Sequence, residues 1–460
     1  MVYERYHLPI EPAPNQAPHP DRFQVRVSRF GLAKLLLSEI IHTRADMKVV
    51  LSRPCLYGVF SGPVGGFAPR PQHCVGCLRC TVEYPDMVEV KPNPDRLSLG
   101  DSYFKPAAVD TVIYESATGR VPVRGAGYRG AFGGDGWDGM WTDMSEIVRP
   151  TRDGIHGRET ISTYVDLGER PGWLTFDHAG RPTGPLQRPW GIQLPMILDV
   201  MPASAESPGL YRSLSRAAEI AQTAAIIPFE WIRKLSLEGD RIVPLISAKQ
   251  AGTLAELERG PALIELDGWA RATFDKLREV LPETVIGIRL PFDADLDEML
   301  SSGVRFFHLT ADYHGRTPKG FVADRIRQVH QTLVDLGLRE QVTLIGSGGL
   351  VAAEHVPKAI LCGLDAVGLD TPVLVALQGR LKGEALARGS ASVEMPAVDE
   401  AWMVRRTVNL LASWHGQLLE ILGAMGMREV RRLRGEWGRA MFQQDLEMEA
   451  FGEIAGFRHG

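Results

Sequence analysis

The stretch LPMILDVM at residues 194–201 is the first of eight short apolar runs that alternate with segments of helical pattern. The other seven are TAAIIP (223–228), RIVPLIS (241–247), ALIELDG (262–268), TVIGIRL (284–290), FFHLTAD (306–312), QVTLIGS (341–347) and DAVGLD (365–370). Continuous apolar runs separated by helices are typical of a parallel sheet with both faces covered. Eight such units predict an α/β fold, a (β/α)8 TIM barrel over residues 191–385, with a doubly wound sheet as the alternative.

Two helix starts inside this region carry capping signals. Ser207 followed by Pro208 predicts an N-cap and a first turn before LYRSLSRAAEIA, because serine accepts a backbone hydrogen bond and proline fits the first turn. Thr371 followed by Pro372 predicts the same arrangement before VLVALQ. Each start follows a predicted strand, as the barrel requires.

The regions on either side of the barrel have a different texture. Residues 1–190 are rich in proline and glycine, which predicts an irregular N-terminal region, apart from a helix near residues 30–42. Residues 386–460 predict a C-terminal helical extension that packs on the barrel, with a second helix over 437–454. Before that helix comes a basic run that predicts a solvated helix face, Arg428, Arg431, Arg432 and Arg434. We therefore expect three parts, with boundaries at residues 190 and 385.

Composition places the chain among ordinary soluble proteins. It has 460 residues, of which 44% are hydrophobic and 23% charged, and its net charge is −5. This balance excludes wholesale disorder and provides no basic footprint for nucleic acid. The N-terminus lacks the apolar core of a secretory signal, and the apolar stretch at 30–41 is too short to span a membrane. We expect a cytoplasmic protein with no membrane span and a small-molecule substrate.

Three cysteines stand at C-x2-C-x2-C in CVGCLRCTVEYP, which begins at Cys74. This spacing lets successive thiolates face one metal or cluster, and it matches the bacterial ferredoxin run except that Tyr84 replaces the fourth cysteine. A protein with one cluster must then take its fourth thiolate from elsewhere, and Cys55 is the candidate nearby. The preferred interpretation is a 4Fe-4S cluster on four thiolates, Cys55, Cys74, Cys77 and Cys80.

Two other interpretations of these cysteines stay open. One is structural zinc, held by the same four thiolates or with His73 in place of one of them. The other is chance packing of buried thiols. Five cysteines placed so unevenly do not form a disulfide framework, and the isolated Cys362 is predicted to be a small core residue.

The loops after the last two predicted strands carry a phosphate-site pattern. Barrel enzymes commonly bind a phosphate there, where backbone N–H groups face the anion. The two segments are Gly346, Ser347, Gly348 and Gly349, and Gly368, Leu369, Asp370 and Thr371. Glycine lets the backbone approach ligand oxygens, and the two hydroxyl groups add donors. Their position predicts a phosphate site, and an ordinary turn and helix start is the alternative.

Three segments resemble a known family. GSGGLVAAEHVPKAILCGLDAVGLDTPVLVAL (346–377) is similar to the flavin-phosphate segment of the FMN-binding domain of glutamate synthases. VMPASAESPGLYRSLSRAAE (200–219) is similar to that domain's first strand and helix, and LLASWHGQLLEILGAMGMREVRRLRG (410–435) to the helix and turn that close the family's barrel. Together they span most of residues 190–440.

The resemblance implies an FMN in the barrel. Its phosphate would be held by residues 346–349 and 368–371, and its ring would lie across Pro202, Ala203 and Ser204. Arg289 falls where the family usually has a lysine near the flavin, so its cation would stabilise negative charge on the reduced ring. A buried ion pair is the alternative for Arg289.

The chain also departs from the family. The three-cysteine motif expected after strand eight is absent from TPVLVALQGRLKGEALARG (371–389), and the substrate loops are shortened to IIPFEWIRK and TADYHGRTPKG. Asp370 puts a carboxylate where the family's phosphate pocket has glycine. The chain begins Met-Val, without a cysteine that could become a glutaminase nucleophile. We expect a partner subunit to supply ammonia or electrons, within an oligomer or complex.

Candidate acid–base groups follow two strands at the catalytic end of the barrel. Lys249 follows the third strand, and Asp312 and His314 follow the sixth. The alternative for each of them is a solvated loop residue without a catalytic role. Together with Arg289 they form the predicted catalytic set.

Two segments before the barrel are predicted to cover the site. The glycine-rich stretch 119–139 is a lid or a surface loop. The second segment is RPTRDGIHGRE (149–159), which is predicted to bind an anionic substrate or to cap the flavin. The alternative is an ion-paired linker. Its charged members are Arg149, Arg152, Asp153, His156 and Arg158.

These features predict a glutamate synthase-like oxidoreductase. The N-terminal cluster passes single electrons to FMN, which reduces a small polar substrate, an amino acid or imine-like compound, by hydride transfer. The alternative is a non-catalytic scaffold or electron-transfer subunit that carries a degenerate barrel in a larger complex.

Overall fold

The computed structural model describes residues 6–46, 55–62, 64–121, 134–143, 160–170, 175–183, 189–254 and 260–457. Two compact units make up the chain. The first, here called the body, combines Met1–Gln16 with Asp101–Gly460, and the second, here called the cysteine unit, is Ala17–Gly100. The three-part division at residues 190 and 385 stays a prediction. Segment 149–159 and most of the glycine-rich stretch 119–139 lie outside the described residues.

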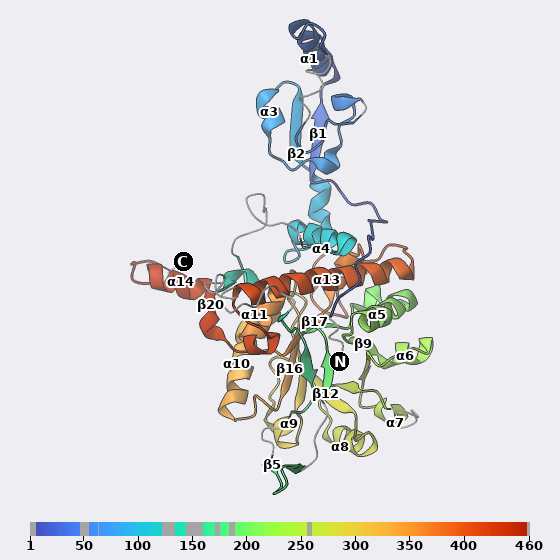
Figure 1. Ribbon diagram of the computed structural model, residues 1–460, viewed down its shortest axis with the longest axis vertical. Coiled ribbons are helices and arrows are strands. Elements are labelled where there is room, and N and C mark those ends of the chain that lie inside the picture. The colour runs from blue at the N-terminus through green and yellow to red at the C-terminus, as the bar shows by residue number, and fades with distance from the viewer. Residues whose placement is uncertain are drawn as a thin grey trace. The chain divides into compact units, whose positions relative to one another are not determined.

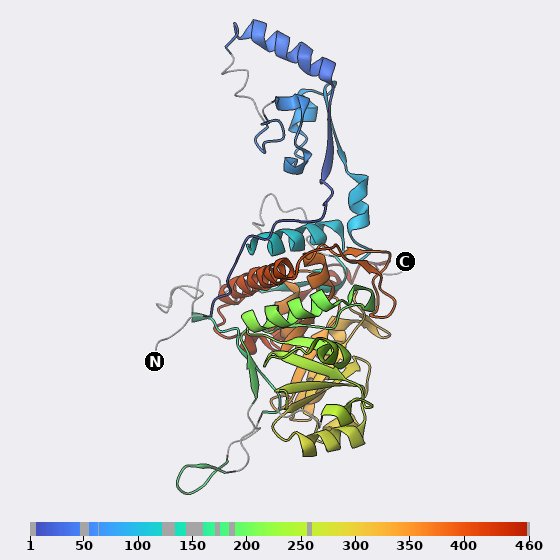
Figure 2. The same ribbon diagram turned by 90° about the vertical axis from the view of Figure 1, so that its right-hand side faces the viewer.

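Eight parallel strands close into a barrel in the order β10-β11-β12-β13-β16-β17-β8-β9. They are β8 (Met196–Leu198), β9 (Ala225–Pro228), β10 (Ile242–Ile246), β11 (Leu263–Asp267), β12 (Val285–Pro291), β13 (Phe306–Thr310), β16 (Thr343–Ser347) and β17 (Ala366–Leu369). Each coincides with one of the predicted apolar runs, so the barrel is confirmed and the doubly wound alternative is wrong. Figures 1 and 2 show the strands within the body, with helices around them.

A helix follows every strand of the barrel. These helices are α5 (Pro208–Ile220), α6 (Phe229–Leu235), α7 (Ala251–Leu254), α8 (Arg271–Val280), α9 (Asp297–Ser301), α10 (Val322–Asp335), α11 (His355–Cys362) and α12 (Thr371–Ala376). The predicted cap of α5 is confirmed, because the Ser207 hydroxyl accepts from the backbone N–H of Leu210 at 3.2 Å. The predicted cap of α12 is wrong by one residue: Asp370, not Thr371, caps it. Cys362 is fully buried, as predicted.

The C-terminal extension covers one side of the barrel. Its main helix, α13 (Glu400–Ala424), packs against α5 and against α4 (Pro106–Thr118). The prediction of one helix over 437–454 is wrong. A 3-10 turn, strand β20 (Ala440–Phe442) and the short helix α14 (Gln443–Phe451) occupy this stretch. The cause is long-range pairing, since β20 pairs antiparallel with β3 (Met140–Thr142).

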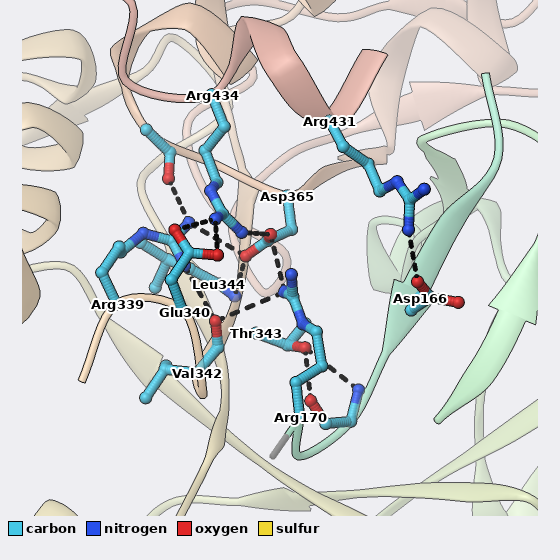
Figure 3. Close-up of polar contacts among 12 residues, drawn as sticks. Asp166, Arg170, Arg339, Glu340, Val342, Thr343, Leu344, Asp365, Arg431 and Arg434 are labelled. Carbon is cyan, nitrogen blue, oxygen red and sulfur yellow. Dashed lines mark hydrogen bonds and ion pairs between the residues drawn. The ribbon is translucent and has the colours of Figure 1, made fainter. Parts of the chain in front are cut away.

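Asp365, just before β17, binds three arginines from separate parts of the body (Figure 3). Arg170 and Arg434 donate to its Oδ1 at 2.8 and 2.7 Å, and Arg339 donates to its Oδ2 at 2.9 Å. The backbone N–H of Leu344 adds a fourth hydrogen bond at 2.8 Å. Burial alone would raise the pKa of Asp365, but the three guanidinium groups hold this pKa well below its ordinary value.

This cluster corrects the prediction for the basic run at 428–434. The Arg434 side chain is only 9% exposed, so it belongs to the packed body rather than to a solvated face. Arg431 behaves more as predicted, because its side chain is 45% exposed and pairs with Asp166 at 2.8 Å. The run lies in a 3-10 turn at Val430–Leu433 rather than in a helix.

Shorter elements complete the body. They are β4 (Val165–Leu167), β5 (Thr175–Phe176), β6 (Pro182–Thr183), β7 (Trp190–Ile192), β14 (Arg316–Thr317), β15 (Gly320–Phe321), β18 (Arg380–Leu381) and β19 (Val393–Glu394). The first stretch of the chain packs beside α13, where Arg406 donates to the Ala13 carbonyl at 2.9 Å and Trp402 to the Pro14 carbonyl at 2.8 Å. Within the described residues, no helix is both long and apolar enough to cross a membrane.

The cysteine unit is built on a small antiparallel sheet. β1 (Phe23–Val27) pairs with β2 (Val88–Pro92), and Val25 lies opposite Val90. The described part of this unit contains the predicted helix α1 (Arg29–His42) and the short helix α3 (Arg79–Glu83). Its small core contains Val25, Val59 and Val88, and three of the cysteines pack against it.

Candidate functional site

Five polar side chains form a connected group inside the barrel. They come from four strands and from the residue that follows β8, and they are Asp199, Glu265, Arg289, His308 and Ser347. Arg289 donates to both oxygens of Asp199, at 2.8 and 2.9 Å, and to Glu265 at 3.2 Å. His308 lies 2.7 Å from Glu265 through Nδ1 and 2.6 Å from the Ser347 hydroxyl through Nε2. His308 Nε2 also lies 3.7 Å from Asp199 Oδ2, which closes a ring of polar contacts that we call the barrel ring.

The barrel ring is buried, and its charges compensate one another. Glu265 and His308 are fully buried, and only 14% of the Arg289 side chain is exposed. Burial would raise the pKa of Asp199, but Arg289 and His308 hold this pKa well below its ordinary value. Burial would lower the pKa of Arg289, yet Asp199 and Glu265 raise it. Arg289 thus sits in the buried ion pair that was the alternative in its prediction.

The glycines after β16 are required by the backbone. Gly348 and Gly349 have φ of +106° and +74°, which side chains rarely adopt. A Cβ on Gly348 would lie 2.4 Å from the carbonyl oxygen of Asp312. Gly349 donates its N–H to the Tyr313 carbonyl at 3.2 Å.

Two backbone donors in this loop lack a partner. Gly348 and Leu350 are buried, and their N–H groups donate to no acceptor among the described residues. A buried N–H without an acceptor is costly and uncommon in folded proteins. The loop therefore has the donors that an anion such as a phosphate requires.

The loop after β17 is more closed. Gly368 has no room for a side chain, because a Cβ would lie 2.0 Å from the Ser347 hydroxyl. The Asp370 carboxylate accepts hydrogen bonds from the N–H and the hydroxyl of Thr371, so it occupies the start of α12 itself. Burial, together with nearby Asp199, raises the pKa of Asp370 to about 7.

The residues after β8 lie under a later part of the chain. Pro202 is buried, while Ala203 and Ser204 are exposed. Ala203 donates its N–H to the Arg388 carbonyl at 3.0 Å, and the Ser204 hydroxyl donates to the Ala391 carbonyl at 2.9 Å. The segment after β18 thus covers this edge of the barrel.

His314 is the predicted acid–base residue with the most defined surroundings. Its Nε2 lies 2.8 Å from Asp101, whose carboxylate is fully buried, and its ring stacks on Tyr103 at 5.2 Å. The Tyr103 hydroxyl donates to the Gly349 carbonyl at 2.7 Å, so residues 101–103 connect His314 with the candidate phosphate loop. Glu384 completes a group of three ligand-type side chains with Asp101 and His314, whose atoms lie within 4.8 Å of one another.

The other two predicted acid–base residues are placed differently. Asp312 accepts the backbone N–H groups of His314 and Arg316 at 3.0 and 2.7 Å, so its carboxylate stabilises the turn. Lys249 is exposed in the loop after β10 and makes no ion pair with a described residue.

The four predicted cluster ligands lie around one cavity in the cysteine unit. Cys55, Cys74, Cys77 and Cys80 all line it, together with apolar side chains that include Val25, Val59 and Val90. Burial and the other three thiols raise the pKa of the Cys80 thiol. The structure therefore brings the three thiols of the C-x2-C-x2-C run together with Cys55, the candidate for the fourth ligand, and it leaves Cys362 in the body.

The backbone around this cavity also points to an anionic occupant. Gly76 and Leu78 both have positive φ, at +68° and +59°. From Val75 to Arg79, the N–H groups donate to no backbone or side-chain acceptor among the described residues. Alternating left- and right-handed residues of this kind form concavities of N–H groups that bind anions, including iron–sulfur clusters.

The comparisons with known proteins bear on the barrel first. Residues 322–385 match the family model described as the conserved region in glutamate synthase. An archaeal-type glutamate synthase [NADPH] of Dehalococcoides mccartyi is 22% identical over 437 residues, which cover 80% of this chain and 86% of that protein. By these matches the barrel is similar to that of the glutamate synthase family.

Two further proteins are similar to this chain. The archaeal glutamate synthase [NADPH] of Methanocaldococcus jannaschii is 30% identical over 217 residues, which are 43% of this chain and 40% of that protein. The crystal structure of the monotopic membrane protein (S)-mandelate dehydrogenase has 13% sequence identity and a TM-score of 0.41 to this chain. The match covers 60% of this chain and 86% of the dehydrogenase chain.

Sequence reasoning missed three members of the barrel ring: Asp199, Glu265 and His308. A signal was present, since each is a polar residue inside an otherwise apolar strand run. Buried charges are rare unless they are paired, so three such residues predict a shared polar layer. Asp101 gave no comparable signal, because it lies far from the barrel in sequence.

Proposed function

We propose that this chain is a glutamate synthase-like flavin oxidoreductase with two cofactors. FMN binds in the barrel, and a 4Fe-4S cluster binds the four thiolates of the cysteine unit and passes single electrons to it. The substrate is a small polar compound with an imine-like bond. The observation that carries the proposal is the pair of unpartnered N–H groups on buried Gly348 and Leu350, in the loop after the seventh strand.

The residues of the two loops are chemically suited to the FMN phosphate. Gly348 and Leu350 would donate their backbone N–H groups to it. The carboxyl group of Asp370 does not prevent phosphate binding. Its pKa is about 7, and a phosphate beside it would raise this pKa further, so the group would be largely protonated. The neutral carboxyl then becomes a donor. When bound, FMN would supply hydride transfer and one-electron steps.

The cysteine cavity favours a cluster over a single zinc ion. Four thiolates around zinc lie about 3.8 Å from one another, given Zn–S bonds of about 2.3 Å. Among the described residues, the cysteine sulfurs form no group of three within 4.8 Å of one another. The apolar lining of the cavity and its free N–H groups are features that tune cluster potentials.

Of the predicted catalytic residues, His314 is the best supported for proton transfer. An ionised carboxylate only accepts hydrogen bonds, so Asp101 fixes the proton of His314 on Nε2 and leaves Nδ1 as a base. Reduction of an imine requires a proton on nitrogen in addition to the hydride, and a protonated His314 would supply it. The role of Arg289 would be to hold the barrel ring together.

A second function has one specific observation in its favour. Asp370 already caps α12, and the segment after β18 lies on Ser204, as in a barrel whose ligand site has been filled by its own chain. In that case the chain is a scaffold or electron-transfer subunit of a larger complex. A partner that supplies ammonia or electrons belongs to both proposals.

Cofactor analysis of protein purified without air separates these functions. The first predicts one FMN released on denaturation and about four iron atoms per chain. Iron without flavin would favour the electron-transfer subunit. Protein with neither iron nor flavin would refute both the oxidoreductase and the electron-transfer subunit and would leave the scaffold. One zinc per chain would refute the cluster.

A further inference from the structure

Helix α1 of the cysteine unit carries three large apolar side chains that face solvent. Phe30 is 83% exposed, Leu37 is 61% exposed and Ile41 is 69% exposed. They are seven and four positions apart, and residues at these spacings lie on the same side of an α-helix. Leu32, the buried residue of α1, lies on the opposite side of the helix. We call Phe30, Leu37 and Ile41 the α1 face.

The helix is held to the cysteine unit by its first turn. The Ser28 hydroxyl accepts from the Gly31 N–H at 3.2 Å, and the Ser28 N–H donates to the Met87 carbonyl at 2.8 Å. A Cβ on Gly66 would lie 3.1 Å from the Leu32 side chain, so Leu32 packs closely on the backbone there. From this turn α1 extends beyond the strands β1 and β2 (Figures 1 and 2). The α1 face is therefore presented to solvent by a helix whose start is fixed.

Basic residues accompany the α1 face. Residues 22–46 contain five lysines and arginines against two aspartates and glutamates, a net charge of +3 in a chain whose net charge is −5. Lys34 lies beside the α1 face, since it follows Phe30 by four residues, and it is exposed. Arg29 is the first residue of the helix, and Arg44 follows its end. Positive charge and exposed apolar surface thus belong to the same helix.

We propose that the α1 face docks this protein onto an anionic phospholipid surface. Helix α1 has 14 residues. At about 1.5 Å per residue it is about 21 Å long, which is too short to cross a hydrocarbon core of about 30 Å. The helix would lie in the plane of the interface with the α1 face among the acyl chains. Lys34 would extend its ammonium group to the headgroup phosphates.

Both parts of the surface contribute to such binding. Burial of apolar side chains and attraction of basic residues to anionic lipid act together in interfacial helices, and the resulting attachment is reversible. The inference does not depend on the proposed function, because neither the flavin nor the cluster takes part in it.

The charge of α1 argues against a second copy of this chain as the occupant. Pairing two α1 faces would bring together two regions that each have a net charge of +3, and like charges across an interface are unfavourable. Stable protein interfaces bury about 1,200–2,000 Å² in total, and three side chains on one helix do not supply this area. An apolar groove on another protein would also have to desolvate Lys34, whereas a membrane leaves its ammonium group among the headgroups.

The test measures binding of the full chain, with its cofactors, to phospholipid vesicles that are then sedimented. One set of vesicles contains equal parts of phosphatidylcholine and phosphatidylglycerol, and the other contains phosphatidylcholine alone. Leu37→Glu changes the α1 face, and Lys34→Gln changes the charge beside it. The controls are Val82→Glu on α3 and Lys91→Gln on β2, because Val82 is 78% exposed and the Lys91 side chain 63% exposed in the same unit.

We expect wild type at low salt to bind the anionic vesicles at least about tenfold more tightly than the neutral ones, and added salt to weaken this binding. Leu37→Glu should bind at least about tenfold more weakly, because it removes an inserted side chain and adds a repelled charge. Lys34→Gln should lose about fivefold, the factor that one basic residue contributes near an anionic surface. Val82→Glu and Lys91→Gln should bind as wild type does.

Phe30→Trp provides a second readout. Its emission, taken as the difference from wild type, should shift to the blue on the anionic vesicles, because the indole ring then leaves water. The matched variant Val82→Trp should show no shift.

Three results would overturn the inference. Wild type that does not bind the anionic vesicles would exclude a lipid partner, and a dimer that Leu37→Glu dissociates would then assign the α1 face to a second copy. Equal losses in Val82→Glu and Lys91→Gln would assign the binding to the charge of the whole unit. An unshifted Phe30→Trp emission would show that this face stays in water. Iron and flavin contents are measured on the same preparations, so a failure of the proposed function is seen separately.

Discussion

Replacing Asp365 by asparagine should be among the most destabilising single changes in the body. The carboxylate is 6% exposed and accepts from Arg170, Arg339 and Arg434 at 2.7–2.9 Å. Asparagine has nearly the same size, so the change removes the charge without making a cavity. It leaves three guanidinium groups around a neutral amide, and removing one partner of a buried ion pair costs about 3–5 kcal/mol.

Urea denaturation followed by tryptophan fluorescence measures this cost. Asp365→Asn should lower the midpoint without changing the slope, which reports a change in the free energy of unfolding alone. Asp166→Asn is the control, because its partner Arg431 is 45% exposed and such pairs contribute about 0–1 kcal/mol. If Asp365→Asn loses less than about 1 kcal/mol, the three arginines do not depend on this carboxylate and the reasoning is wrong.

Three further predictions concern the cofactor sites and the pH response. Cys55→Ser should give a three-iron or oxygen-labile centre with an altered electron paramagnetic resonance signal, whereas Cys362→Ser should leave the spectrum unchanged; an intact wild-type cluster in Cys55→Ser would disprove its role as a ligand. His308→Ala should raise the FMN dissociation constant about tenfold, because losing the hydrogen bond that positions Ser347 costs about 1.4 kcal/mol of binding free energy. His308→Gln should restore part of the FMN affinity. Equal FMN content in both variants and in wild type would contradict this role of His308. Burial and Arg339 lower the pKa of His330 from 6.5 to about 4. As the pH falls, the unfolded chain therefore binds a proton on this histidine before the folded chain does. The free energy of unfolding should fall by roughly 3 kcal/mol between pH 6.5 and 4, and a pH dependence that is unchanged in His330→Gln would refute this.

The barrel could be predicted because its strands are buried on both faces. Runs such as TAAIIP and QVTLIGS then read as continuous apolar segments, and the periodicity has no competing interpretation. The cap at Ser207 was predictable for a similar reason, since it depends on neighbouring residues alone. Asp370 could have been predicted as the cap of α12, because aspartate is a stronger N-cap residue than the adjacent Thr371.

Features that depend on distant parts of the chain were not predictable from local patterns. Nothing near residue 440 indicates that β20 pairs with β3, which lies about three hundred residues earlier in the chain. In the sequence, Arg434 cannot be distinguished from its exposed neighbours, because its burial depends on the distant residue Asp365. The partnership of His314 with Asp101 likewise joins two loops that only the closed barrel brings together.

The body is assembled from two separate stretches of chain, and this has a practical consequence. A shortened protein that begins at Asp101 would remove the cysteine unit, but it would also remove residues 6–16. Arg406 would lose its hydrogen bonds to Ala13 and Asn15, and this fully buried cation has no carboxylate among its hydrogen-bond partners in the described residues. Gln16, whose N–H donates to the Gln378 side chain at 2.8 Å, marks where the polypeptide leaves the body, and Asp101 marks where it returns. Excising the cysteine unit therefore calls for a linker that joins Gln16 to Asp101 rather than for a new start codon.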